Sequence, residues 1–284
     1  MSTVIVADQL QAKLNGQWYD MWTRIRAGSL DAARASQGMQ LVQEDRWDKQ
    51  VDVPYANERV PSTLGYPESF MWHTAKEQEE FWRSQKPTRK LDASHITDLA
   101  KRIYDQCLPP GMETIGVWPK YSRLGGLYTA TGTIFGLIAK ARSFKNWRGD
   151  EILSPGYWRH TIKTAGCLER LDRYQPGDYF VVPIQGGKLW VGASIRHARS
   201  RYAEAEFGLC PYSGVCLLAA NPNRITGDGQ LYMDMAGCEW APFAGGDFYS
   251  SAYFGWYVGQ LNFDCRYVGH ASVGCGSASG FLPQ

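Results

Sequence analysis

The stretch SAYFGWYVGQLNFDCRYV (residues 251–268) decides the fold of the C-terminal half of this chain. Two runs of aromatic and β-branched residues flank Gly259, which is the arrangement of a β-hairpin. Alternation in the second run places one set of side chains on one face, Leu261, Phe263, Cys265 and Tyr267, and a charged set on the other, Asp264 and Arg266. One face is therefore expected to join the core of an antiparallel sheet.

The region around this hairpin also differs in composition from the rest of the chain. From Tyr202 onward the chain carries five of its seven cysteines, two arginines, no lysine and a formal charge of −5, against +7 for residues 1–201. A segment rich in glycine and aromatic residues with few charges is buried or paired into sheet rather than solvated. We therefore expect the compact core, and any functional site, toward the C-terminus.

Helical patterns dominate the residues that precede this region. Capping signals, apolar spacing and helix-stopping prolines predict helices at 74–85, from 92 to about 107, at 128–142, at 154–174 and at 210–220. Strand signals predict 179–184 with a hairpin return at 188–195, and a further strand at 231–236. The fold class predicted is α+β, with a helical N-terminal half and a mainly antiparallel β-sheet in the C-terminal half.

The N-terminal residues are expected to form a separate region. Val4–Arg26 has helical spacing, but the pattern fails between Ser36 and Ser69, where prolines stand at positions 54, 61 and 67. This interval is long for a loop and is expected to be an extended arm, packed either on its own chain or on a neighbour. The domains predicted are 1–69, an N-terminal helix and extended arm, and 70–284, an α+β core domain.

Composition and sequence pattern indicate the cellular compartment and the class of partner. Residues 1–14 lack the pattern of a secretory signal, and no apolar run reaches the length of a membrane span. We therefore expect a cytoplasmic protein with reduced thiols. The net charge of +2 comes without a concentrated basic stripe, so no nucleic-acid partner is predicted.

Acidic residues near the C-terminus form the first candidate ligand-binding set. Asp234 falls near the end of the strand predicted at 231–236, and Glu239 and Asp247 follow in the next loop. Carboxylates on loops after strands bind hard cations or act as acid and base. The alternative is that these side chains only cap turns. No metal site and no cofactor are predicted, because no metal-binding pattern is present.

Cysteine and histidine supply the candidate catalytic residues. Cys275 lies between two glycines and near His270, so its thiol is unshielded in the sequence. A nucleophilic cysteine needs a base within hydrogen-bond reach. Cys210 and Cys216 have a C-x5-C spacing that zinc pairs do not favour. A helix over 154–174 would hold His160 and Cys167 roughly 10 Å apart along its axis, which is too far for a direct hydrogen bond.

The function predicted is a non-catalytic interaction or structural protein that works as a component of a larger assembly. The chain lacks the H-E-x-x-H and G-x-S-x-G motifs, and its tryptophans and tyrosines are residues enriched at interfaces. Protein partners or self-association are therefore expected. The alternatives are a hydrolase-type enzyme with a C-terminal site, built on the acidic set or on Cys275 and His270, and a small-ligand or carbohydrate binder.

Overall fold

The computed structural model describes residues 25–26, 55, 57–106 and 108–283. The chain divides into two compact units, Met1–Pro54 and Tyr55–Gln284, and the description below concerns the second. The helix predicted at 4–26 lies almost entirely outside the described residues, as do residues 36–54 of the predicted arm and Cys107. The domain boundary predicted after residue 69 falls inside the second unit.

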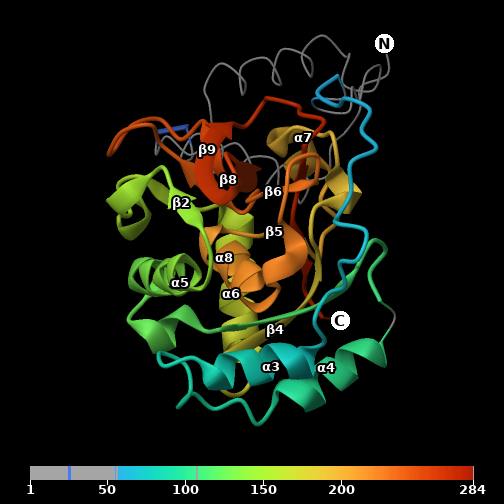
Figure 1. The fold of residues 1–284 in the computed structure, drawn as a ribbon, viewed down its shortest axis with the longest axis vertical. Helices are drawn as coiled ribbons and strands as arrows, with labels where there is room; N and C mark the ends of the chain where they lie inside the picture. Colours follow the sequence, from blue (N-terminus) through green and yellow to red (C-terminus); the bar gives the residue numbers. More distant parts are fainter. Residues whose placement is uncertain (1–24, 27–54, 56, 107, 284) are drawn as a thin grey trace, which may run out of the picture. The chain divides into compact units, whose positions relative to one another are not determined.

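The second unit combines helices with antiparallel and mixed sheets, so the predicted α+β class is confirmed (Figure 1). Its helices are α3 (Ala75–Ser84), α4 (Ile96–Tyr104), α5 (Leu127–Ala141), α6 (Ile162–Tyr174), α7 (Ile195–Arg201) and α8 (Pro211–Ala220). None of the helices in the described ranges combines the length and apolar character that crossing a bilayer requires.

Two sheets organise this unit. The first has the order β1 (Thr114–Pro119), β4 (Tyr179–Gln185), β11 (Ser279–Phe281) and β5 (Glu206–Gly208). The second has the order β10 (Cys275–Ser277), β6 (Tyr232–Asp234), β8 (Ser250–Tyr257), β7 (Cys238–Trp240) and β3 (Trp158–His160). It is extended by β9 (Gln260–Tyr267), which pairs with β8, and by β2 (Phe144–Asn146), which pairs with β9.

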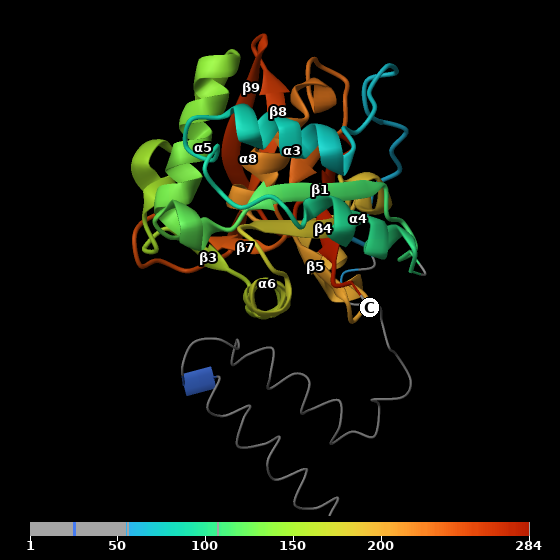
Figure 2. The same ribbon diagram turned by 90° about the horizontal axis from the view of Figure 1, so that it is seen from below.

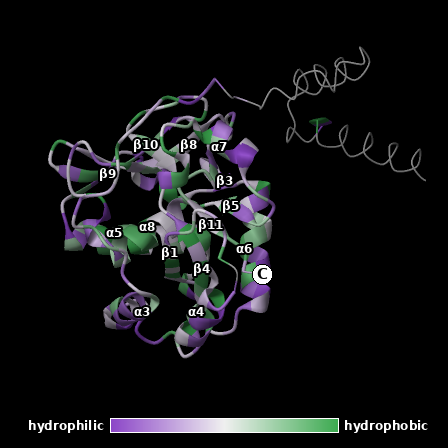
Figure 3. Cartoon of the chain, turned by 90° about the vertical axis from the view of Figure 1, so that its right-hand side faces the viewer, coloured by the Kyte–Doolittle hydropathy of each residue, from purple (hydrophilic) through white to green (hydrophobic). Residues whose placement is uncertain are grey.

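Helix α8 is the interior helix, and all ten of its residues are buried. It packs against β1 of the first sheet, β8 of the second, and helices α3 and α5. In Figure 2, α3 and α8 lie above β1 and α6 lies on the opposite side of that sheet. Apolar colour gathers around α8, β1 and β4 in Figure 3. The sequence explains this position, since the helix carries no charge and is apolar on every side.

The hairpin predicted from residues 251–268 is present as β8 and β9. Phe254 pairs with Phe263 across the two strands, and their rings lie 5.0 Å apart. The turn uses Val258 and Gly259, both at positive φ, which is the geometry that tight hairpin turns require. Two other local predictions hold equally well: the capping box of Thr74 and Glu77 opens α3, and α8 spans the helix predicted at 210–220.

Two predicted elements are wrong. Residues 188–195 do not return as a strand, because both edges of β4 are taken by β1 and β11. They form a short 3-10 helix at Lys188–Trp190 and then enter α7, which Ser194 caps by accepting a hydrogen bond from the His197 N–H. The helix predicted from residue 154 begins only at Ile162, after Thr161 as its N-cap.

Residues 57–73, which we call the strap, form no helix or regular strand and are bent by a turn between Pro67 and Phe70. Backbone hydrogen bonds fix it at three points, from Val60 N to Gly192 O (2.9 Å), from Ser194 N to Glu58 O (2.9 Å) and from Leu231 N to Gly65 O (2.7 Å). Its aromatic end is held by Glu113, whose carboxylate accepts from the Tyr66 hydroxyl (2.5 Å) and the Trp72 indole (3.0 Å). This part of the predicted arm therefore lies against its own chain.

The N-terminal end of the strap should loosen in acid. Hydrogen bonds from Arg196 hold the pKa of Glu58 below its ordinary value of 4.5 despite partial burial, and Ser194 and the charge of His197 act in the same direction. A depressed carboxyl pKa gives stability that is present above 4.5 and is lost as the pH falls through the lower value. Hydrogen–deuterium exchange of strap peptides, corrected for intrinsic pH dependence, should therefore accelerate below pH 4.5.

Two variants test whether Glu58 protects the strap from exchange. Glu58→Gln should exchange quickly at pH 7, because the charged partner of Arg196 is already absent. Glu68→Gln alters an exposed carboxylate of the same strap and should leave the exchange unchanged. Equal protection of the wild-type strap at pH 7 and pH 3 would show that Glu58 does not anchor it.

Candidate active site

Cys210 is the N-cap residue of α8 and is only 1% exposed. It follows β5, where the chain makes an unusually close backbone contact: a Cβ placed on Gly237 would lie 2.0 Å from the Gly208 carbonyl oxygen. Only glycine fits at that contact, since any side chain would clash with backbone. The close approach brings the turn before β7 directly against the residues that lead into Cys210.

His160 ends β3 and lies beside the same turn. Gly237 is bonded on both sides: its N–H donates to the carbonyl of Leu209 (2.7 Å), and its carbonyl accepts from the N–H of Thr161 (2.9 Å). One glycine therefore links the residue before Cys210 to the residue after His160. The Arg199 side chain also holds this turn, since it donates to the carbonyl oxygens of Ala236 (2.8 Å) and Cys238 on either side of Gly237.

The start of α8 provides hydrogen bonds to the Cys210 sulfur. The backbone N–H of Ser213 donates to Cys210 Sγ, and the Ser213 hydroxyl accepts from the Cys210 N–H (2.9 Å). Unpaired N–H groups at a helix N-terminus carry partial positive charge, which favours an anion at this position. The N-terminus of α8 thus stabilises the thiolate of Cys210 relative to the thiol.

Cys210 differs electrostatically from every other described cysteine. Burial acts to raise its pKa, but the charge of the neighbouring His160 and the bonds from Ser213 together lower the pKa below its ordinary value. Burial instead raises the pKa of the remaining described thiols: Cys167, Cys216, Cys238 (to about 11), Cys265 and Cys275 (to about 12). Cys210 is therefore the one thiol among the described cysteines whose surroundings lower its pKa.

The His160 ring is a neighbour of this sulfur. Its Nε2 atom is buried and makes no hydrogen bond of ordinary geometry, although the ring lies close enough to Cys210 to lower the thiol pKa. Contacts between catalytic groups are often loose in a ligand-free enzyme and tighten when substrate binds. In the described part of the chain no carboxylate or amide side chain is bonded to His160, so the pair is a dyad.

Tyrosines surround the dyad. The Tyr121 ring lies 6.2 Å from His160 and 6.0 Å from Tyr212, and the Tyr128 hydroxyl donates to the Trp158 carbonyl (2.9 Å). Burial raises the pKa of Tyr121 and Tyr128, and the charge of Cys210 adds to the shift in both. Both rings are half-buried, whereas Cys210 is covered.

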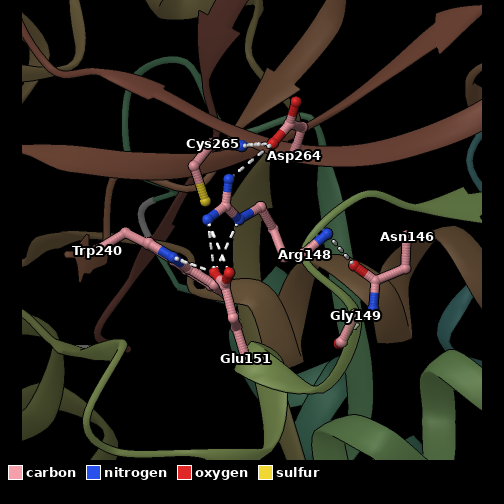
Figure 4. A network of polar contacts seen from close by, with 7 residues as sticks. All are labelled: Asn146, Arg148, Gly149, Glu151, Trp240, Asp264 and Cys265. Carbon is pink, nitrogen blue, oxygen red and sulfur yellow. Dashed lines mark hydrogen bonds and ion pairs between the residues drawn. The ribbon is translucent and has the colours of Figure 1, made fainter. Parts of the chain in front are cut away.

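A polar network around Arg148 links the residues that follow β2 to β7 and β9 (Figure 4). Arg148 forms a bidentate pair with Glu151 and an ion pair with Asp264 (3.7 Å), and Glu151 accepts from the Trp240 indole (3.2 Å). Trp240 in turn stacks on Trp158 at 6.1 Å with an interplanar angle of 5°. These contacts hold Trp158 of β3, two residues before His160.

Two of the site residues predicted from sequence, Asp234 and Cys275, lie together in a second cluster that does not include Cys210 or His160. Asp234 is fully buried and pairs with Arg266 at 2.6 Å. Burial raises the pKa of Asp234, and the charges of Arg266 and His270 act against that shift. Cys275 belongs to the same cluster, since Asp234 and Arg266 both affect its pKa. Because that pKa is about 12, the Cys275 thiolate is scarcely populated near neutral pH.

The other two acidic residues do not bond to this cluster. Glu239 pairs with Arg159 at 2.9 Å, with both side chains partly exposed, and Asp247 is exposed in the loop between β7 and β8. Among the described residues no group of three or more histidine, cysteine, aspartate or glutamate side chains has metal-binding geometry. The six described cysteines are free thiols.

Sequence reasoning missed the pairing of Cys210 with His160. It treated Cys210 as half of a C-x5-C spacing and assigned His160 to a helix, whereas the structure places His160 in β3. One local signal was available, because Cys210 directly precedes a proline that opens an apolar helix. Proline favours the first helical position, so the residue before it is the N-cap, where a thiol meets the helix N-terminus.

Comparison with known proteins gives no further assignment. No protein-family model, no curated protein and no solved structure matches this chain. The geometry of the site therefore carries the functional argument.

Proposed function

We propose that this protein is a thiol-dependent acyl-transfer enzyme, with Cys210 as the nucleophile and His160 as the general acid and base. The observation that carries the proposal is the placement of Cys210 as the N-cap of α8, where its sulfur accepts from the Ser213 N–H, while Gly237 joins Leu209, the residue before it, to Thr161, the residue after His160. The lowered pKa of the buried Cys210 thiol agrees with this placement. A buried structural cysteine shows the opposite shift. Lowered thiol pKa at a helix N-terminus beside a histidine is a property of reactive cysteines.

The chemistry follows from the two groups. The Cys210 thiolate attacks the carbonyl carbon of an ester, thioester or amide, and protonated His160 delivers its proton to the leaving group as the bond to carbon breaks. The acyl group is then held as a thioester on Cys210. Neutral His160 removes a proton from water, the resulting hydroxide attacks the thioester carbon, and the acid product leaves as the thiolate reforms.

Access to the sulfur requires side-chain movement. Because Cys210 is covered in this conformation, a substrate carbonyl reaches it only when a neighbouring side chain moves aside. Tyr121 and Tyr128 are the half-buried rings next to the dyad, so we expect them to move. Rotation of partly exposed side chains is fast compared with typical turnover.

The test is site-resolved alkylation. The wild-type protein is treated with iodoacetamide between pH 5 and 10, and the modification of each cysteine is followed by peptide mass spectrometry. The midpoint for Cys210 should lie at lower pH than the midpoint for Cys275. His160→Gln should move the Cys210 midpoint upward, because it removes the main charge that stabilises the thiolate. Equal midpoints for the two cysteines would contradict the proposal.

A non-catalytic role in an assembly remains the second proposal. It is supported by exposed apolar side chains at the two ends of the β8–β9 hairpin, Tyr257 (64%) and Val258 (75%) at the turn and Tyr249 (48%) and Tyr267 (49%) at the open end. Exposed aromatic residues are favoured where proteins meet. Light scattering distinguishes the proposals in part, since a monomer at all concentrations counts against self-association.

A further inference from the structure

A cavity of about 270 Å³ lies between α4, α6 and the residues that follow β11. Its floor is apolar and includes Ile103, Leu171 and Leu282, each of which is buried. Its rim carries two guanidinium groups, from Arg102 on α4 and Arg170 on α6. The lining thus combines buried apolar side chains with two exposed arginines.

Neither rim arginine is neutralised by a carboxylate of the described chain. Arg102 Nε donates only to the carbonyl of Asp98, at 3.4 Å, and Arg170 has no ion pair in the same residue ranges. A matched arginine on α6 behaves differently, since Arg173 pairs with Glu169 at 3.0 Å. Two unpaired arginines at the mouth of an apolar cavity are complementary to a single anionic group.

We infer that this cavity binds a medium-chain carboxylate, with its acyl tail on the apolar floor and its carboxylate between Arg102 and Arg170. The volume lies just below the roughly 300–1,000 Å³ usual for small-molecule sites, so it suits a short, unbranched chain rather than a large cofactor. Guanidinium groups favour carboxylates because their N–H donors match both oxygens.

This site is separate from the dyad. It is formed by the C-terminal end of α6, from Arg170 to Gln175, whereas the N-terminal end of the same helix touches the dyad region through the hydrogen bond from Thr164 to Gly208 O (3.0 Å). None of the cavity-lining residues bonds to Cys210 or His160. Binding of a carboxylate in this cavity therefore does not depend on acyl transfer at Cys210.

The experiment is calorimetric titration of the full chain with octanoate, 1-octanol and octyltrimethylammonium, which share a tail and differ in head-group charge. Octanoate should bind most tightly, and its Kd should rise with salt because the head group is partly exposed. Arg102→Gln and Arg170→Gln should each raise the Kd for octanoate by about tenfold, the loss expected for one charge-assisted interaction. Neither change should affect binding of 1-octanol.

Matched controls come from the same two helices. Lys101→Gln on α4 and Arg173→Gln on α6 remove one positive charge each without altering the cavity lining, so both should leave the octanoate Kd within about twofold of wild type. All four substitutions lie at exposed positions, so folding is expected to persist and is checked by circular dichroism. Absence of octanoate binding at millimolar concentration, or equal losses in the controls and the rim variants, would overturn the inference.

Discussion

Replacing Cys210 by alanine should abolish the rapid acylation phase with p-nitrophenyl acetate, and His160→Gln should slow that phase by about 10²–10⁴-fold, the usual contribution of one general acid or base. The first substitution removes the atom that attacks the carbonyl. The second removes the group whose charge lowers the pKa of Cys210 and whose proton is needed by the leaving group. Stopped-flow measurement of p-nitrophenolate release reports both effects.

The matched control for this experiment is Cys275→Ser. Cys275 is buried like Cys210 but has a pKa of about 12, so its thiolate contributes little near neutral pH. The variant should therefore retain the wild-type burst amplitude and rate. A burst that survives in Cys210→Ala and disappears in Cys275→Ser would place the nucleophile at Cys275, which the sequence offered with His270 as one alternative to a non-catalytic role.

The second large effect concerns the stability of the buried ion pair between Asp234 and Arg266. Arg266→Met should lower the free energy of unfolding by about 3–5 kcal/mol, because it leaves the fully buried Asp234 carboxylate without its partner. Burial already raises the pKa of Asp234 above its ordinary value. A raised carboxyl pKa means that stability is lost as pH rises through it, so the deficit should be smaller at pH 4 than at pH 7.

Urea unfolding followed by tryptophan fluorescence measures this difference, provided that the slope m is unchanged. The matched variant is Arg159→Met, which breaks an ion pair with Glu239 whose side chains are 51% and 30% exposed. Exposed pairs contribute about 0–1 kcal/mol, so this variant should unfold close to wild type. If both variants lost a similar free energy of unfolding, burial of the ion pair would not determine how much stability its removal takes away.

The parts of the fold that could be predicted from sequence are those whose signals are local. The Thr74 and Glu77 capping box lies within four residues, and the β8–β9 hairpin needs only alternation around one glycine turn. Helix α8 was recognisable because its apolar run ends at Asn221-Pro222. In each case the sequence signal and the stabilising contact involve the same few residues.

The errors arose where distant residues decide the structure. Ser154-Pro155 has the form of a helix start, but the pairing of Trp158 with Trp240 forms β3 and delays the helix to Ile162. That pairing is specified by residues about eighty positions away, which no local pattern reports. The dyad was missed for the same reason, since Gly237 connects the neighbours of His160 and Cys210 from a third part of the chain.

The position of β11 between β4 and β5 has a consequence for folding kinetics. Ser279–Phe281 must insert between strands that precede it by more than seventy residues, and contacts of such separation form late and slow the folding reaction. Until insertion, β4 and β5 each expose an unpaired edge able to capture a strand from another molecule. Aggregation during refolding should therefore depend on concentration most strongly before β11 docks.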